Sequence, residues 1–243
     1  MWPDRPQCSP LLWQMKEAMT MQLSELKNEL ARFGAENDAH ETERARRMLN
    51  ITPDTGEFLS VLVRFGNARR VLEIGTSNGY STLWIAEAAA AIDGHVTTLE
   101  YAADKVAMAR DAFARSGLAD RITLVHGDAG QWLAQAADAS IDLLFLDSDR
   151  EQYAGWWPQL RRVLRRGGLL VVDNATSHAA QMEPLRALLD ADQDRLGSAD
   201  VQCFEMEELM HSKAAVAAVL SYLFARFEER FDGAPTLLIL DEA

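Results

Sequence analysis

The sequence predicts an α/β fold built on a doubly wound, mostly parallel sheet. Short apolar runs alternate with helical segments between residues 71 and 189, and one of these runs, Ile141–Leu146, is apolar almost throughout. Alternation of strands with helices is typical of parallel sheets, because two parallel strands need a crossover connection. A continuously apolar run indicates a strand that is buried on both faces.

The expected elements follow one another in a regular order. Before the sheet, apolar residues at helical spacing are Leu23, Leu26, Leu30 and Phe33. A charged helix is expected over 41–49, and Thr52-Pro53-Asp54 is typical of a helix start. The expected strands are Val71–Ile74, Val96–Leu99, Ile122–Val125, Ile141–Leu146 and Leu169–Val172. The helices between and after them are Ser81–Ala91, Ala102–Ser116, Gln131–Ala136, Tyr153–Leu164 and Ala179–Leu189. The order predicts a Rossmann-like sheet with N-terminal helices.

Composition narrows the classes of partner. The chain has 243 residues, of which 48% are hydrophobic, so a sizeable core can form. The formal charge of −13 argues against DNA or RNA as the main partner. Two widely separated cysteines, Cys8 and Cys203, do not predict a disulfide framework. No apolar run approaches the length of about 20 residues that spans a bilayer, and the first ten residues do not resemble a signal peptide. We therefore expect a cytoplasmic protein without a membrane partner.

Polar and glycine residues gather where the expected strands end. These residues are Glu73, Gly75, Glu100, Asp128, Asp147 and Asp173. In doubly wound sheets, ligands bind beyond the carboxyl ends of the strands. This convergence predicts the position of a site better than any single motif does.

The loop after the first strand, Gly75-Thr76-Ser77-Asn78-Gly79, favours one kind of cofactor. Its glycines have the spacing G-x-x-x-G, so the middle glycine of the dinucleotide-binding pattern is absent. Glu73 would repel a diphosphate but attract an ammonium group, and Glu100 is placed to accept protons from both ribose hydroxyls. S-adenosylmethionine carries an ammonium and a ribose but no phosphate. The alternative is a structural glycine turn beside an unrelated acid.

The stretch Val71–Ser81, VLEIGTSNGYS, resembles motif I of the class I methyltransferases. It is most similar to the catechol and caffeoyl-CoA O-methyltransferase group, and the resemblance covers about residues 21–200. It implies that Ser81 meets the methionine carboxylate, Glu100 the ribose and Asp128-Ala129 the adenine edge. The implied cofactor contacts are Ile51, Glu73, Gly75, Thr76, Ser77, Gly79, Ser81, Glu100, Asp128, Ala129 and Asp147. For Ile51, plain packing is an equal alternative.

Asp147, Asp173 and Asn174 follow the fourth and fifth expected strands. Two carboxylates and an amide oxygen at neighbouring strand ends suit Mg²⁺, which prefers oxygen ligands and keeps open positions for substrate. A divalent cation would favour the ionised form of an acceptor oxygen. The resembled family has its metal ligands at these positions. The alternative is that these residues cap the helices that follow them.

The segment Asp147–Tyr153 resembles the family pattern D-x-D-K-x-x-Y, with Arg150 in place of the lysine. That lysine is usually the general base or the electrostatic partner of the acceptor oxygen. Arginine cannot act as a base near neutral pH, although it can stabilise a phenolate or position a carboxylate. The expected catalytic residues are therefore Asp147, Arg150, Asp173 and Asn174.

The C-terminal segment departs from the family pattern. Residues 202–243 resemble the Walker B region of conjugal-transfer (type IV secretion) ATPases, with an apolar run before Asp241-Glu242. The chain contains no G-x-x-x-x-G-K-[ST] motif to hold a triphosphate. We expect an irregular extension over 1–20, a methyltransferase domain over 21–200 and an atypical helix–strand segment over 201–243. Thr236–Leu240 is expected to add a strand to the sheet edge.

The expected activity is methyl transfer from S-adenosylmethionine to an oxygen of a small catechol-like or phenolic acceptor, assisted by a divalent metal. One alternative is a protein that binds S-adenosylmethionine but is catalytically impaired. Another is an ATPase-derived interaction fragment on a vestigial domain. A homodimer is a further expectation from the resemblance.

Overall fold

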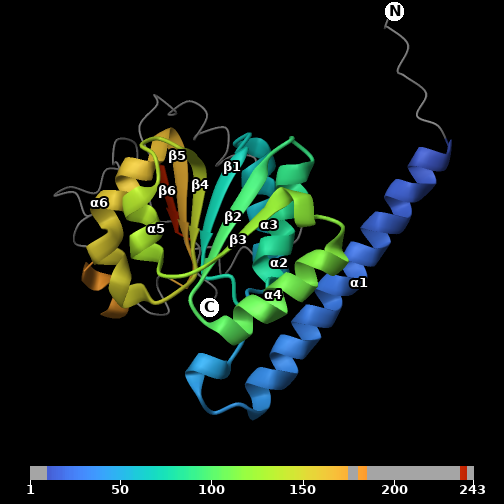
Figure 1. Cartoon of the computed structure of the whole chain (residues 1–243), viewed down its shortest axis with the longest axis horizontal. Coiled ribbons are helices and arrows are strands. Elements are labelled where there is room, and N and C mark those ends of the chain that lie inside the picture. Colours follow the sequence, from blue (N-terminus) through green and yellow to red (C-terminus); the bar gives the residue numbers. More distant parts are fainter. Residues whose placement is uncertain (1–9, 175–179, 185–235, 240–243) are drawn as a thin grey trace, which may run out of the picture.

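The computed structural model describes residues 10–174, 180–184 and 236–239, with the side chains of 20–174 and 180–184. Its centre is a parallel sheet with the strand order β3-β2-β1-β4-β5-β6 (Figure 1). The strands are β1 Arg70–Ile74, β2 His95–Glu100, β3 Ile122–His126, β4 Ile141–Leu146, β5 Leu164–Val172 and β6 Thr236–Ile239. The strand order reverses between β1 and β4, which is where doubly wound sheets bind ligands.

Helices cover both faces of the sheet (Figure 1). The α-helices are α1 Pro10–His40, α2 Pro53–Phe65, α3 Tyr80–Ala90, α4 Ala103–Ser116, α5 Ala129–Gln135 and α6 Tyr153–Val163. Three short 3₁₀ helices are η1 Arg44–Arg46, η2 Ala119–Arg121 and η3 Arg150–Gln152. None of the helices in the described part of the chain is long and apolar enough to cross a membrane.

Two hydrophobic cores lie on opposite faces of the sheet because side chains alternate along each strand. Val71, Leu143 and Phe145 pack in the core that α1, α2, α3 and α4 cover. Their neighbours Leu72 and Leu144 pack in the other core, under α5 and α6. Every residue of β4 is buried, as the apolar run predicted.

The expected strands and the sheet-edge strand are confirmed. β6 pairs with β5 in parallel register from Leu169↔Thr236 to Val172↔Ile239. β5 begins earlier than expected, at Leu164, and its pairing with β4 shifts register between Ile141 and Leu143. Residues 180–184 are helical, within the helix expected over 179–189. The helical part of the segment expected over 201–243 and Asp241-Glu242 lie outside the described residues.

Two expectations about the N-terminal region are wrong. Helix α1 begins at Pro10, so residues 10–20 are helical rather than irregular. The helix expected over 41–49 is absent, and only the single turn η1 forms there. The reason is a tertiary contact, because the Asp38 carboxylate accepts hydrogen bonds from the backbone N–H groups of Met48 and Leu49, at 2.6 and 2.8 Å. These bonds hold residues 48 and 49 in a turn, with a φ of 50° at Leu49.

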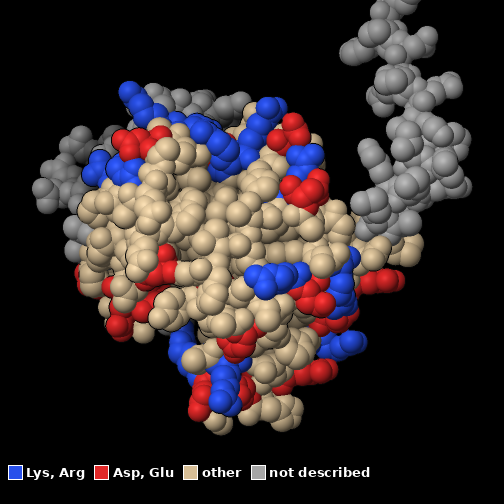
Figure 2. Space-filling model, in the orientation of Figure 1, with Lys and Arg blue, Asp and Glu red and all other residues tan. Residues whose placement is uncertain are grey.

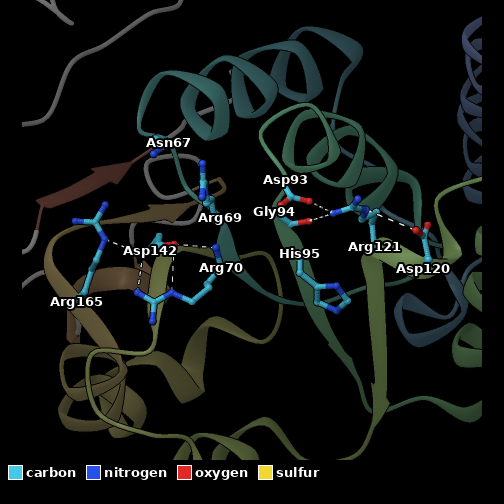
Figure 3. A pocket seen from close by; sticks show the side chains of 10 residues that line it. All are labelled: Asn67, Arg69, Arg70, Asp93, Gly94, His95, Asp120, Arg121, Asp142 and Arg165. Carbon is cyan, nitrogen blue, oxygen red and sulfur yellow. Dashed lines mark hydrogen bonds and ion pairs between the residues drawn. The ribbon is translucent and has the colours of Figure 1, made fainter. Parts of the chain in front are cut away.

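Three strands are tied together at the amino edge of the sheet (Figure 3). Asp142 of β4 accepts hydrogen bonds from the backbone N–H and the guanidinium of Arg70 on β1, both at 2.8 Å, and from Arg165 of β5 at 2.7 Å. Burial raises the pKa of Asp142, but these bonds outweigh it and hold the pKa below its usual range. The network therefore stabilises the arrangement of β1, β4 and β5.

We expect Asp142→Asn to lower the free energy of unfolding by about 1–3 kcal/mol at pH 7, because two guanidinium groups lose a buried charged acceptor. The folded-state pKa is depressed, so the stabilisation is complete above the unfolded-state pKa of about 4 and is lost as pH falls through the folded value. Urea denaturation at pH 7 and pH 3 checks both statements. Asp120→Asn, at an exposed acid in the same hollow, is the control, and equal losses in the two variants would contradict the prediction.

Candidate functional site

The structure has hollows at both ends of the sheet. The hollow at the amino edge, about 810 Å³, is lined by ion pairs such as Arg121–Asp93 and the Asp142 network (Figure 3). The cavity at the carboxyl edge, about 860 Å³, is lined by residues that follow β1, β2, β4 and β5. We take the carboxyl-edge cavity as the candidate site because the strand ends converge there and the topological switch point lies there.

The structure places eight of the sequence-predicted site residues on the wall of this cavity. They are Gly75, Ser77, Glu100, Asp128, Ala129, Asp147, Arg150 and Asn174. Basic and acidic side chains are interspersed over the face of the molecule that Figure 2 shows.

Both glycines of the loop after β1 are needed where they stand. Gly75 has a φ of 110°, and a Cβ atom there would lie 1.9 Å from the carbonyl oxygen of Asp147. Gly79 has a φ of 90°, and its Cβ would lie 2.7 Å from the ring of Phe113. Only glycine combines such backbone angles with such close approach. The loop therefore packs directly against the loop after β4.

Glu73 supports the loop from below. Its carboxylate is fully buried and accepts hydrogen bonds from Ser81 and Thr98, each at 2.6 Å, and from Thr82. Burial raises the pKa of Glu73 to about 7, although the three hydroxyl groups act in the opposite direction. Thr76 is also buried and bonds to Thr98 at 2.6 Å.

Four predicted cofactor contacts, Glu73, Thr76, Gly79 and Ser81, are therefore buried beneath the cavity wall. A fifth, Ile51, is 4% exposed and packs in the hydrophobic core beside α2 and α3. These five residues therefore lie behind the residues that line the carboxyl-edge cavity, where they support the loop after β1 and its surroundings.

Glu100, at the end of β2, is held in one orientation facing the cavity. One carboxylate oxygen accepts from the backbone N–H of Ser77 at 2.8 Å. The other accepts from the N–H groups of Tyr101 and Ala102, each at 2.9 Å. A carboxylate has about four acceptor positions, so about one remains for a further donor. The arrangement suits a ligand that presents a hydroxyl group to Glu100.

The loop after β3 forms another part of the wall. Asp128 caps helix α5 by accepting from the N–H of Gln131 at 2.8 Å, and Ala129 follows it at the cavity. Trp156 of α6 also lines the cavity, whereas Trp132 packs against the neighbouring core. Sequence reasoning treated Trp156 as a packing residue, because nothing in the sequence places α6 beside this loop.

Residues 44–49 cover one side of the cavity and were missed by the sequence analysis. Arg44, Met48 and Leu49 are part of its lining. The segment is held by Ser77, which donates to the carbonyl of Met48 at 2.8 Å, and by Lys105, which donates to the carbonyl of Arg47 at 2.8 Å. The signal in the sequence was Asp38, an acidic residue near the end of helix α1. Its hydrogen-bond partners, Met48 and Leu49, lie ten or more residues further along the chain, so a local pattern does not reveal the contact.

Asp147 and Asp173 lie side by side at the ends of adjacent strands. The N–H of Asp147 donates to the carbonyl of Ile74, and that of Asp173 to the carbonyl of Leu146, both at 3.0 Å. Asn174 follows with a φ of 55°, and its amide group donates to the Asp173 carboxylate. The structure thus brings together the three residues predicted to bind metal.

The chemistry of these donors fits a hard cation with oxygen ligands. Within residues 10–174, 180–184 and 236–239, no three His, Cys, Asp or Glu side chains cluster as metal ligands. A metal here would therefore be held by two carboxylates, the amide oxygen of Asn174 and water. The Asn174 amide would have to turn its oxygen toward the ion, since its nitrogen faces Asp173.

Arg150 is buried beside these acids, with 7% of its surface exposed. Its Nη2 atom lies 3.9 Å from a carboxylate oxygen of Asp147 and 3.4 Å from the carbonyl oxygen of Asp173. Asp149, in the same loop, is exposed and caps η3. The hydroxyl of Tyr153 accepts from the N–H of Ser148 at 2.7 Å, and burial raises the pKa of Tyr153.

A family model described as O-methyltransferase matches residues 18–196. The chain is 40% identical over 145 residues to a catechol O-methyltransferase of Mycobacterium tuberculosis, covering 60% of this chain and 64% of that protein. The match thus spans less than two thirds of the relative's length.

The chain is also similar to proteins of known structure. Cofactor-bound Rv0187 from MTB is 36% identical with a TM-score of 0.53, over 68% of this chain and 70% of that one. An O-methyltransferase from Bacillus cereus in complex with SAH is 28% identical with a TM-score of 0.55, over 69% and 76%.

We expect Gly75→Ala to destabilise the protein by roughly 2–4 kcal/mol, because a strained φ is combined with a clash against the Asp147 backbone. Gly155→Ala is the matched control, since a Cβ at this position in α6 meets no atom within 4 Å. The control should gain about 0.5–1 kcal/mol from helix propensity. Urea denaturation of both variants measures the difference, and similar stabilities would refute the close approach.

Proposed function

The chain belongs to the O-methyltransferase family, and we propose that it transfers a methyl group from S-adenosylmethionine to an oxygen of a small catechol-like or phenolic acceptor, with a divalent metal, Mg²⁺, assisting. The observation that carries the proposal is the juxtaposition of the Gly75 loop with Glu100 and Asp147 around one cavity.

The cofactor half of the proposal rests on Glu100 and the loop beside it. The carboxylate is oriented by three backbone N–H groups, so about one of its four acceptor positions remains for a ribose hydroxyl. Asp128 and Ala129 lie at the same wall, where the adenine would meet them and Trp156. The buried Glu73 keeps the loop in place through its three hydroxyl partners.

The acceptor half rests on Asp147, Asp173, Asn174 and Arg150. When bound, S-adenosylmethionine supplies an electrophilic methyl group, and a divalent cation supplies charge that favours an ionised acceptor oxygen. Asp147 and Asp173 would hold the cation through carboxylate oxygens, and Asn174 through its amide oxygen. Residues 44–49 would exclude water from one side of the acceptor.

A second candidate is a protein that binds S-adenosylmethionine without efficient turnover. The observation that favours it is Arg150, which occupies the place of the family's lysine and cannot take a proton from the acceptor near neutral pH. The two candidates share the cofactor site and differ in whether methyl transfer follows.

We expect calorimetric titration of S-adenosylmethionine to show saturable binding that weakens in Glu100→Ala by about 1–3 kcal/mol, because hydrogen bonds to a charged group are lost. Glu100→Gln separates the charge from the contact. Asp104→Ala, at an exposed acid four residues away on α4, is the control and should bind like the wild type. A folded wild-type protein without binding would sink the assignment.

We expect EDTA to stop methylation of catechol and Mg²⁺ to restore it. Asp173→Asn should raise the Mg²⁺ concentration needed for half-maximal activity by at least about tenfold, since even groups that only contact a metal ligand have effects of that size. Asp149→Asn, in the same region but with its side chain capping η3, should change it little. Full activity in the presence of EDTA would argue against metal assistance. The proposal that the protein binds S-adenosylmethionine would still stand.

A further inference from the structure

The hollow at the amino edge of the sheet lies at the opposite end of the strands from the candidate site (Figure 3). The described residues that line it include four arginines and three aspartates, although the formal charge of the whole chain is −13. Positive charge therefore gathers in this hollow against the overall charge of the protein.

On the side of β1 and β5, the hollow contains more arginine than acid. Arg70 and Arg165 share the single carboxylate of Asp142, which is 8% exposed. Arg70 uses its Nε and Nη2 atoms for this contact, whereas Arg165 uses Nε and donates through Nη1 to the carbonyl of Arg166. Two guanidinium groups on one carboxylate leave one positive charge uncompensated, and each group keeps a terminal nitrogen for a further acceptor.

Arg69, directly before β1, adds a second uncompensated charge to the same side. Its side chain is exposed and has no hydrogen bond or ion pair with any of the residues that the structure describes (Figure 3). A guanidinium has five N–H donors, and those of Arg69 are all available to a ligand. Asn67, which also lines the hollow, can donate through its amide group.

The opposite side of the hollow, near β3, is unfavourable for an anion. Arg121 lies there between Asp93 and Asp120, with nitrogen–oxygen distances of 2.8 and 3.6 Å. The hydrogen bond from Arg121 and, to a smaller extent, the charge of Arg69 lower the pKa of Asp93, so this acid stays ionised. Two acids against one arginine leave an excess of negative charge. A bound anion would therefore lie on the side of β1 and β5.

We propose that Arg69, Arg70 and Arg165 form a binding site for a phosphate group, either inorganic phosphate or a small phosphate monoester. The planar guanidinium fork matches phosphate oxygens bidentately. A phosphate monoester carries a charge of about −1.5 to −2 at pH 7, which matches the two uncompensated arginine charges, whereas a carboxylate would match only one. The site goes beyond the proposed methyl transfer and does not depend on it, because the two hollows share no lining residue.

The test is calorimetric titration of the full chain with inorganic phosphate and, separately, with glycerol 3-phosphate. The titrations are made at pH 8, where both probes are dianions, and at low ionic strength, because salt screens exposed charges. We expect saturable binding of one phosphate group per chain. Tighter binding of glycerol 3-phosphate would assign the site to monoesters, and tighter binding of inorganic phosphate would assign it to the free anion.

In Arg69→Gln the dissociation constant should rise about tenfold, because hydrogen bonds between two charged groups are lost. Arg165→Gln is a second variant with the same expected direction, and circular dichroism shows that each variant is folded. Arg44→Gln is the matched control, since Arg44 is an exposed arginine that lines the carboxyl-edge cavity instead, and it should bind phosphate like the wild type.

A folded wild-type protein without saturable phosphate binding would overturn the proposal. So would an unchanged dissociation constant in either folded variant of the amino-edge arginines. Binding that weakens in Arg44→Gln but not in Arg69→Gln would place the anion in the carboxyl-edge cavity and overturn it as well. None of these results would affect the proposed methyl transfer, which is tested with S-adenosylmethionine at the other end of the sheet.

Discussion

The close approach of Gly75 to the carbonyl oxygen of Asp147 is the constraint on which the rest of the site depends. It brings the loop after β1 against the loop after β4, at the point where the strand order reverses. Any side chain at residue 75 would push the two loops apart. The loops after β1 and β4, which both line the cavity, consequently share one backbone contact, so a ligand that touches both meets a single framework.

Support for this framework comes from polar groups that a ligand would not touch. Glu73 gathers three hydroxyl groups beneath the loop, and Asp38 holds residues 48 and 49 at the cavity mouth. At the far edge of the sheet, Asp142 ties β1, β4 and β5 together. These carboxylates orient the strands and loops, whereas Glu100 and Asp147 line the cavity itself.

Acidic and basic residues lie close together where β4 and β5 end. Asp147 and Asp173 come together because β4 and β5 are neighbours, and Arg150 lies buried next to both. Arginine in this position supplies a permanent positive charge with several donors, whereas a lysine could also exchange a proton. This substitution leaves Asp147, Asp173 and Asn174 in place beside the arginine.

The sequence by itself located the strands β1 to β5 through their apolar periodicity, because burial patterns are local properties of a chain. It also offered Thr236–Leu240 as a possible edge strand, and the structure pairs Thr236–Ile239 with β5. It also located Gly75, Glu100 and the pair Asp147 and Asp173, since each follows a strand. Only the tertiary structure decided that residues 41–49 form a cavity wall instead of a helix, because Asp38 binds their backbone. It likewise decided that Glu73 and Ser81 face inward and that Arg150 is buried beside Asp147. The physical reason is that side-chain direction and long-range hydrogen bonds depend on which elements pack together, and no local pattern records that.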